Sequence, residues 1–167
     1  MKGLLERLIY GHGRLSRYVP FLLAVMMIFY LSSGDGSMSN TSRFIRPLLE
    51  FLFPGADEAT LNVYHAFIRK LAHVGVYAVL AITGSRAFFT SSKSFIKSFW
   101  GPAVFIVVIA VASSDEFNQT LDPTRTGSLF DVFLDLAGGL LGIGLFALLI
   151  RRVSGSFVDT NTTGEQT

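Results

Sequence analysis

The chain has 167 residues, of which 50% are hydrophobic and 16% are charged, and its formal net charge is +2. This composition excludes a soluble domain with an ordinary wetted surface, and the small net charge gives no basis for a nucleic-acid partner. The sequence contains no cysteine, which excludes disulfides, thiolate metal ligands and a cysteine nucleophile.

Four apolar segments indicate an integral membrane protein with four transmembrane helices. At about 20 residues per span, each segment can cross the bilayer once its polar ends are included. The segments are residues 19–31, 71–89, 99–112 and 129–150. The predicted fold is therefore all-α, a four-transmembrane-helix bundle. We expect residues 1–152 to form one membrane domain and the polar residues 153–167 to be a disordered tail.

The first apolar segment follows a basic stretch, residues 1–18, and ends near Gly34. Such a segment is either a membrane helix or a secretory signal peptide, and the length of the basic stretch favours the helix. Residues 44–55 are apolar but too short to span a membrane. They could form a short helix in the membrane interface, starting near Pro47 and ending at Pro54, or a loop that caps the bundle. We expect a short interfacial segment in this first exterior loop.

A long helix can begin at Glu58, and it carries a polar stripe ahead of its apolar part. Residues four positions apart share one face of a helix. Histidine on such a face often shares a hydrogen bond with a neighbouring helix, and Lys or Arg often extends its charge to the interface. His73 shares its end of the bundle with several carboxylates, which favours a functional role, whereas His65 and Arg69 are expected to be structural. The stripe consists of His65, Arg69, His73 and Tyr77.

Four carboxylates bracket the turn between the third and fourth spans. A carboxylate in a membrane helix costs roughly 2.5–3.5 kcal/mol on insertion scales, so four of them indicate a polar site. Ser128 can cap the fourth helix, and Asp131 in its first turn complements the helix dipole, whereas Asp135 lies one turn deeper. The carboxylates are Asp115, Glu116, Asp131 and Asp135, and Gln119 and Arg125 lie between them in the sequence.

Gly138 and Gly142 form a G-x-x-x-G pattern in the fourth helix. Small residues at this spacing let another helix approach the backbone closely. We expect this contact inside the bundle rather than between two copies of the chain.

The positions of Lys and Arg indicate the orientation in the membrane. Nine of the 14 fall on the side of the N-terminus, and five fall on the opposite side. Because cytoplasmic segments are enriched in these residues, we expect a multi-pass protein of the cell membrane with both termini in the cytoplasm. The carboxylates then face the exterior.

Four motifs, in order along the chain, resemble those of the VanZ-like family of small bacterial membrane proteins. Asn118 stands where many relatives carry histidine, and Asp135 where many carry asparagine. The founding member is associated with low-level resistance to the glycopeptide teicoplanin, so the resemblance implies a role in antibiotic resistance at the cell envelope. The motifs are residues 69–77 (RKLAHVGVY), 115–119 (DEFNQ), 125–128 (RTGS) and 131–138 (DVFLDLAG), and the resemblance covers roughly residues 21–150.

The resemblance also implies which residues form the site, and the division into roles rests on the residue types. The residues assigned to catalysis are His73, Asp115, Glu116 and Asp131, and those assigned to binding are Lys70, Tyr77, Gln119, Arg125 and Asp135.

Three functions are compatible with these residues. An exterior polar pocket could bind an envelope lipid, a cell-wall precursor or an amphiphilic antibiotic, with Arg69, Lys70 and Arg125 meeting its anionic groups. A membrane enzyme could use Glu116 or Asp115 as general base and His73 as acid on a lipid-linked ester or phosphate, although no nucleophile motif accompanies them. In a purely structural role, the basic residues neutralise the four acids.

No cofactor is expected, and the implied partners are the lipid bilayer and the ligand of the pocket. A metal-dependent enzyme would use His73 with Glu116, Asp131 or Asp135. Ligation rich in oxygen favours Mg²⁺ or Mn²⁺ over a structural zinc ion. The sequence leaves open whether the protein is an enzyme.

Overall fold

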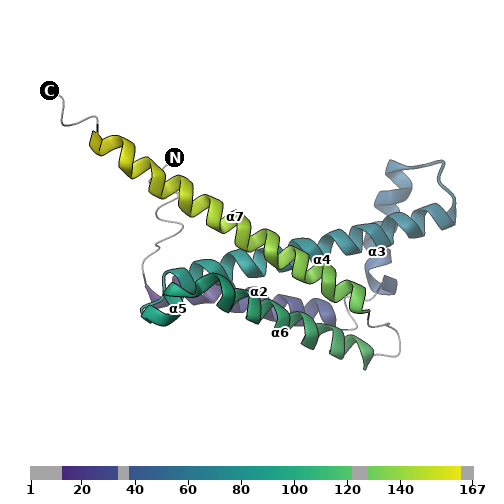
Figure 1. Ribbon diagram of the computed structural model, residues 1–167. Coiled ribbons are helices and arrows are strands. Elements are labelled where there is room, and N and C mark those ends of the chain that lie inside the picture. The colour runs from purple at the N-terminus through teal and green to yellow at the C-terminus, as the bar shows by residue number, and fades with distance from the viewer. Residues whose placement is uncertain (1–12, 34–37, 122–127, 163–167) are drawn as a thin grey trace.

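The structure is a computed structural model that describes residues 13–33, 38–121 and 128–162 (Figure 1). All regular structure in these segments is helical. Four helices are long and apolar enough to cross a membrane, which confirms the predicted all-α fold with four spans. They are α2 (Arg14–Ser32), α4 (Glu58–Phe89), α6 (Trp100–Thr120) and α7 (Leu129–Thr162).

Helix α4 is the central element of the bundle, because it contacts α2, α6 and α7 as well as the two short helices. Its start is fixed by Asp57, whose carboxylate accepts a hydrogen bond of 2.8 Å from the backbone N–H of Thr60. This N-cap satisfies one of the free donors in the first turn, and Glu58 in that turn complements the helix dipole. The chain therefore enters α4 at a defined residue, well ahead of its apolar part.

Three glycines allow α7 to pack closely against its neighbours. A Cβ atom at Gly138 would lie 2.9 Å from the Cα of Val74, and one at Gly142 would lie 2.8 Å from the Cβ of Ala81. Gly139 faces α6, where a Cβ would lie 2.6 Å from Val108 Cγ1. Contacts this short leave no room for a larger residue. The predicted close approach inside the bundle is confirmed, with α4 as the partner of the G-x-x-x-G face.

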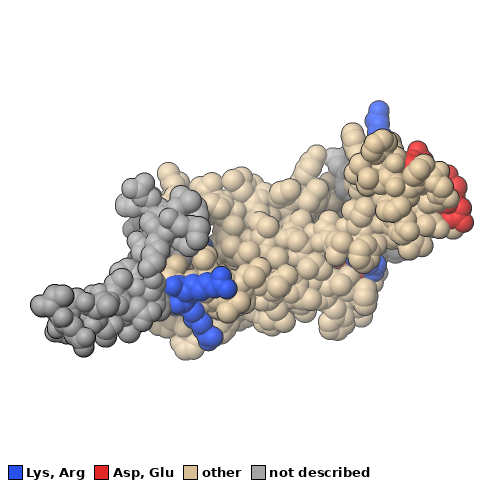
Figure 2. Space-filling view, turned by 90° about the horizontal axis from the view of Figure 1, so that it is seen from above, with Lys and Arg blue, Asp and Glu red and all other residues tan. Residues whose placement is uncertain are grey.

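The bundle buries small and branched side chains and exposes many large apolar ones. Leu80 and Val108 are fully buried, whereas Leu22, Ile106 and Leu141 are more than half exposed. Figure 2 shows charged side chains at the two ends of the molecule and an uncharged middle on the face it presents. An apolar belt of this kind is the surface that lipid chains cover. The buried core cluster is Ala24, Ile28, Tyr77, Leu80, Ala81, Val104, Val108, Val111 and Ala112.

The short helix α3 (Met38–Leu52) packs on the first turns of α4. The predicted start near Pro47 is wrong, because the helix begins at Met38 and Pro47 lies inside it. Proline inside a helix costs about 3 kcal/mol. Contacts with α4 offset this cost, since Thr41 bonds to an α4 side chain and Leu49 is buried. That α3 lies in the membrane interface remains a prediction.

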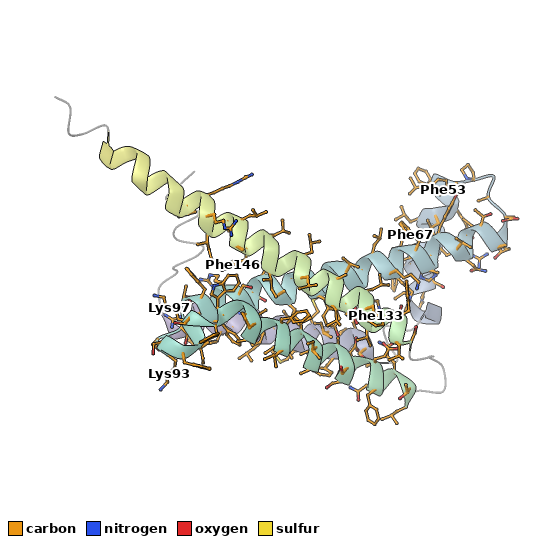
Figure 3. All side chains as sticks on the ribbon, in the orientation of Figure 1. Phe53, Phe67, Lys93, Lys97, Phe133 and Phe146 are labelled. Atoms are coloured by element: carbon orange, nitrogen blue, oxygen red, sulfur yellow. The ribbon has the colours of Figure 1, made fainter. Side chains whose placement is uncertain are left out.

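The opposite end of the bundle carries the basic connection between α4 and α6, which contains one short helix, α5 (Ser94–Ser98). Lys93 and Lys97 project there (Figure 3). The rings of Trp100 and Phe146 meet edge to face at 5.4 Å, next to Phe89. We call this end of the bundle the α5 end. The opposite end, at which α2 and α6 stop and α7 starts, is called the α3 end. Helix α7 continues to Thr162, past the predicted domain boundary at residue 152, and the division of the chain there remains a prediction.

Candidate functional site

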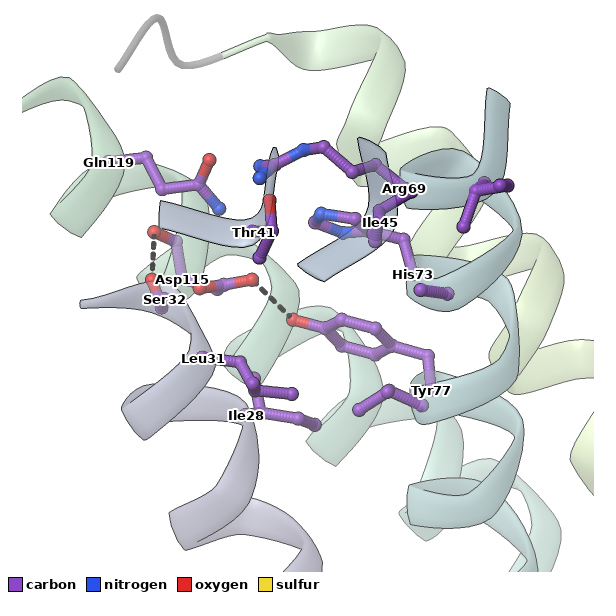
Figure 4. Close-up of a pocket in the computed structure, with 13 residues that line it drawn as sticks. Ile28, Leu31, Ser32, Thr41, Ile45, Arg69, His73, Tyr77, Asp115 and Gln119 are labelled. Carbon is purple, nitrogen blue, oxygen red and sulfur yellow. Dashed lines mark hydrogen bonds between the residues drawn. The ribbon is translucent and has the colours of Figure 1, made fainter. Parts of the chain in front are cut away.

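A cavity of about 150 Å³ lies at the α3 end, between α2, α3, α4 and α6 (Figure 4). Its wall is apolar on the side of α2 and α3, where Ile28, Leu31 and Ile45 contribute side chains. Most of the polar groups come from α4 and α6, and α2 and α3 add one hydroxyl each. The polar lining residues are Ser32, Thr41, Arg69, His73, Tyr77, Asp115 and Gln119.

Helix α4 supplies three of these polar residues from one face. Arg69, His73 and Tyr77 are four residues apart, so the helical repeat directs all three toward the cavity. Figure 4 shows Arg69 reaching across the cavity toward Gln119, above the ring of Tyr77. The stripe seen in the sequence is therefore a lining of the cavity. Arg69 belongs to this lining. Its sequence position alone favours a structural role, and it is an expected partner of anionic groups only if the protein binds a ligand.

His73 contacts α7 through Asp135. Its Nδ1 lies 3.0 Å from Asp135 Oδ1, and the Asp135 side chain is fully buried. The close packing of Gly138 on Val74 explains this contact, because these residues follow Asp135 and His73 by one turn and one residue, respectively. A larger residue at 138 would separate the two helices at the position where the histidine and the carboxylate meet.

Asp115 joins α6 to α4 and α2. The hydroxyl of Tyr77 donates to Asp115 Oδ2 at 3.3 Å, and the hydroxyl of Ser32 donates to the backbone carbonyl of Asp115 at 3.4 Å. Three buried polar atoms in this region have no hydrogen-bond partner within the described segments: Asp115 Oδ1, Asp135 Oδ2 and Gln119 Nε2. Buried polar groups are nearly always paired in native proteins, so these atoms identify a place where water, an ion or a ligand belongs.

A second group of predicted site residues lies at the start of α7 rather than along the cavity. Lys70 Nζ is 3.5 Å from Asp131 Oδ1 and 4.3 Å from the centre of the Phe130 ring. Glu116 accepts a hydrogen bond from the backbone N–H of Ser128. The Ser128 hydroxyl in turn accepts from the N–H of Phe130 at 3.2 Å, which confirms Ser128 as the cap of the helix. These contacts hold the beginning of α7 against α4 and α6.

The predicted site thus divides into two groups. His73, Tyr77, Asp115 and Gln119 line the cavity, and Asp135 touches His73 from behind. Glu116, Asp131 and Lys70 form the contacts at the start of α7, and Arg125 lies outside the described residues.

The residues that α2 and α3 contribute to the cavity were not among the predicted site residues. Ser32 at the end of α2 and Thr41 in the first turns of α3 line it. His65 nevertheless indicated that a further helix packs on α4. This histidine is buried and lies 3.2 Å from Thr41 Oγ1 and 3.1 Å from Ser42 Oγ, so it fastens α3 to α4. An expected structural histidine needs a partner helix, and α3 is that partner.

The arrangement provides hydrogen-bond acceptors, one guanidinium and one imidazole at the end of an apolar pocket. One ring nitrogen of His73 and one carboxylate oxygen each from Asp115 and Asp135 lie within 4.8 Å of one another. These three are the group in the described part of the chain whose donor atoms and spacing suit a metal ion.

Comparison with known proteins supports a family assignment. Searches of curated proteins and of solved structures return no match to the chain. A family model described as VanZ/LLP1 matches residues 18–150, a range that contains α3 to α6 and nearly all of the membrane-crossing parts of α2 and α7. Because this match covers most of the chain, the protein belongs to the VanZ/LLP1 family.

Proposed function

We propose that this protein is an accessory membrane protein of the bacterial cell envelope that binds the polar end of an amphiphile at the α3 end. The candidate ligands are an envelope lipid, a lipid-linked cell-wall precursor and an amphiphilic glycopeptide antibiotic such as teicoplanin. The observation that carries the proposal is the cavity, which joins apolar side chains of α2 and α3 to the polar groups of Arg69, Asp115 and Gln119. Ligand sites commonly combine an apolar wall with a few convergent polar groups.

The size of the cavity limits what enters it. At about 150 Å³ it holds a group roughly as large as benzene, so only one end of an amphiphile fits inside. The rest of the ligand would lie along exposed apolar side chains of the neighbouring helices, such as Leu22, Met26 and Leu71. A phosphate or carboxylate at the entering end matches Arg69, whose planar guanidinium forms two parallel hydrogen bonds to such groups.

The location of the ligand follows from the predicted orientation. With both termini in the cytoplasm, the α3 end faces the exterior and the cavity opens in the outer leaflet. Lipid-linked precursors and glycopeptide antibiotics meet at that surface. A link to glycopeptide resistance at the level of the family supports this choice of ligands.

Filling the mouth of the cavity tests the proposal. Ala72 lines the cavity from α4, whereas Val79 lies on an exposed part of the same helix. We expect Ala72→Phe to abolish labelling of the purified full-length protein by photoreactive analogues of an anionic phospholipid, a polyprenyl phosphate or teicoplanin. The matched variant Val79→Phe adds the same ring to the lipid-facing surface and should be labelled like the wild type. Equal labelling of both variants by all three probes would contradict binding in this cavity.

The contact between His73 and Asp135 favours a second candidate, a membrane enzyme acting on a lipid-linked ester or phosphate. A carboxylate that orients a histidine is a common arrangement in acid and base catalysis. Of the two carboxylates proposed as general base, Asp115 lines the cavity and Glu116 bonds to the start of α7. For an enzyme, His73→Gln should stop turnover of a lipid-linked substrate while labelling by the photoreactive lipid persists. A wild-type protein that leaves every bound lipid unchanged would leave binding as the function.

A further inference from the structure

Three helices bring metal-ligating side chains together beside the cavity. His73 comes from α4, Asp115 from α6 and Asp135 from α7, and one ligand atom of each lies within 4.8 Å of the others. Ligand atoms around a single divalent ion, bound at about 2.1 Å, are roughly 3 to 4.2 Å apart. The 4.8 Å within which the three atoms lie is close to this range.

The two carboxylates of this cluster are buried and each has an unused oxygen. Asp115 is 3% exposed and Asp135 is 0% exposed. Asp115 Oδ1 and Asp135 Oδ2 have no hydrogen-bond partner among the residues that the structure describes. Buried ionised carboxylates are costly unless they are paired or coordinate a metal. A protonated His73 balances one of the two charges, whereas a divalent cation balances both.

Gln119 provides separate evidence for a bound species in the same place. It is 5% exposed, lines the cavity with Asp115, and its Nε2 has no partner in the described part of the chain. Figure 4 shows its side chain directed into the space between α6 and Arg69. A water or an anion bound to a cation at the cluster would accept a hydrogen bond from this amide.

We propose that His73, Asp115 and Asp135 bind one divalent cation with a preference for mixed nitrogen and oxygen ligands, of which Mn²⁺ and Zn²⁺ are the closest fit. Its remaining positions face the cavity, where water or the phosphate of a ligand completes the coordination. This ligand set differs from the one considered from the sequence, because Glu116 of α6 bonds to Ser128 and Asp131 pairs with Lys70 in the first turn of α7. The inference does not depend on the amphiphile, since the cation is measured without it.

Titration of the full-length protein in detergent with Mn²⁺, followed by electron paramagnetic resonance, tests the site. After removal of metals with a chelator, we expect one bound Mn²⁺ per chain, displaced by Zn²⁺. Asp135→Asn and His73→Gln should each weaken binding by roughly tenfold or more, because loss of even an outer-shell partner costs about 10–100-fold in metal affinity. Glu50→Gln removes a carboxylate from an exposed ion pair in α3 and should bind Mn²⁺ like the wild type.

A second measurement on the unaltered protein covers the case in which the variants do not fold. The pulsed spectrum of bound Mn²⁺ should show coupling to an imidazole nitrogen, and this coupling should be absent from any monodisperse His73→Gln protein. Failure to bind stoichiometric Mn²⁺ or Zn²⁺, or bound Mn²⁺ without nitrogen coupling, would overturn the proposal. So would unchanged binding by a monodisperse Asp135→Asn variant. Lipid labelling and its loss in Ala72→Phe test the binding of the amphiphile, and Mn²⁺ titration tests the cation site. A failure of one proposal is therefore distinguished from a failure of the other.

Discussion

Asp115 and Glu116 are adjacent in the sequence, but their side chains serve different helices. Successive residues of a helix point about 100° apart. Asp115 therefore meets Tyr77 of α4, while Glu116 reaches the backbone of Ser128 at the start of α7. Both carboxylates are buried. At this scale, one acidic pair supplies both a group in the cavity and a group that holds the next helix in place.

The hydrogen bond of Glu116 predicts which substitutions at this position are tolerated. Glu116→Gln keeps an oxygen that accepts from the Ser128 N–H, so we expect it to accumulate in the membrane like the wild type. Glu116→Ala leaves that donor without its partner, at a cost of about 1 to 3 kcal/mol. Fluorescence-detected size-exclusion chromatography of the two variants measures the difference. Equal yields of monodisperse protein would show that the contact does not stabilise the fold.

Asp57 predicts a pH dependence at the start of α4. The hydrogen bonds from Thr60 hold the pKa of Asp57 below its ordinary value. The carboxylate therefore stabilises the first turn fully above the pKa of the unfolded chain, about 3.9. This contribution is lost as the pH falls through the lower pKa of the folded protein. Hydrogen exchange of residues 58–61, corrected for intrinsic rates, should accelerate in that acidic range. Asp57→Asn, which accepts the bond without ionising, should show no such change.

Among single residues, the sequence identified those whose chemistry is unusual in a membrane but did not separate their roles. His73, Asp115 and Asp135 stood out because charge inside a span is costly. Whether a buried acid faces a cavity or a neighbouring backbone depends on the rotation of each helix. That rotation is set by packing at Gly138, Gly139 and similar contacts, which a single sequence does not reveal.

At the scale of whole helices, the long spans were predictable and the short helix was not. Twenty apolar residues in a row have few alternatives to a transmembrane helix. The start of α3 was misplaced because proline is typical of the first position of a helix. Only contacts with α4 show that the helix already begins at Met38 and passes through Pro47. The bond between His65 and Thr41 is one of those contacts, and it joins residues 24 positions apart.

The packing of α7 on α4 predicts opposite outcomes for two glycines of α7. A side chain at Gly138 would collide with the backbone of Val74, whereas no atom lies within 4 Å of a Cβ at Gly144. We therefore expect Gly138→Leu to destabilise the protein by at least about 1–3 kcal/mol through overpacking, and Gly144→Leu to have little effect. Thermal unfolding in detergent, monitored by the loss of the monodisperse peak, compares them. Similar stability of both variants would mean that α7 does not pack on α4 through this face.

For the molecule as a whole, the fold connects the two ends of the bundle to different tasks. At the α5 end, aromatic rings pack against one another, and Arg86 donates to the backbone carbonyl of Ser16 at 2.5 Å. At the α3 end, four helices surround the cavity, and the buried acids lie where α4, α6 and α7 meet. Polar groups in membrane proteins are retained where function needs them. The arrangement therefore supports a site at the α3 end, while the contacts at the α5 end hold the helices together.

The orientation of the bundle in the membrane is tested by single cysteines, because the sequence contains none of its own. Gly55 is exposed in the turn between α3 and α4, and Ser92 is exposed ahead of α5, so Gly55→Cys and Ser92→Cys place one thiol at each end. The excess of Lys and Arg on the side of the N-terminus predicts that Gly55→Cys reacts with a membrane-impermeant maleimide in intact cells. Ser92→Cys should react only after permeabilisation, when both variants must label equally as a control for exposure. Labelling of Ser92→Cys in intact cells, with Gly55→Cys protected, would invert the topology and move the cavity and its proposed ligands to the inner leaflet.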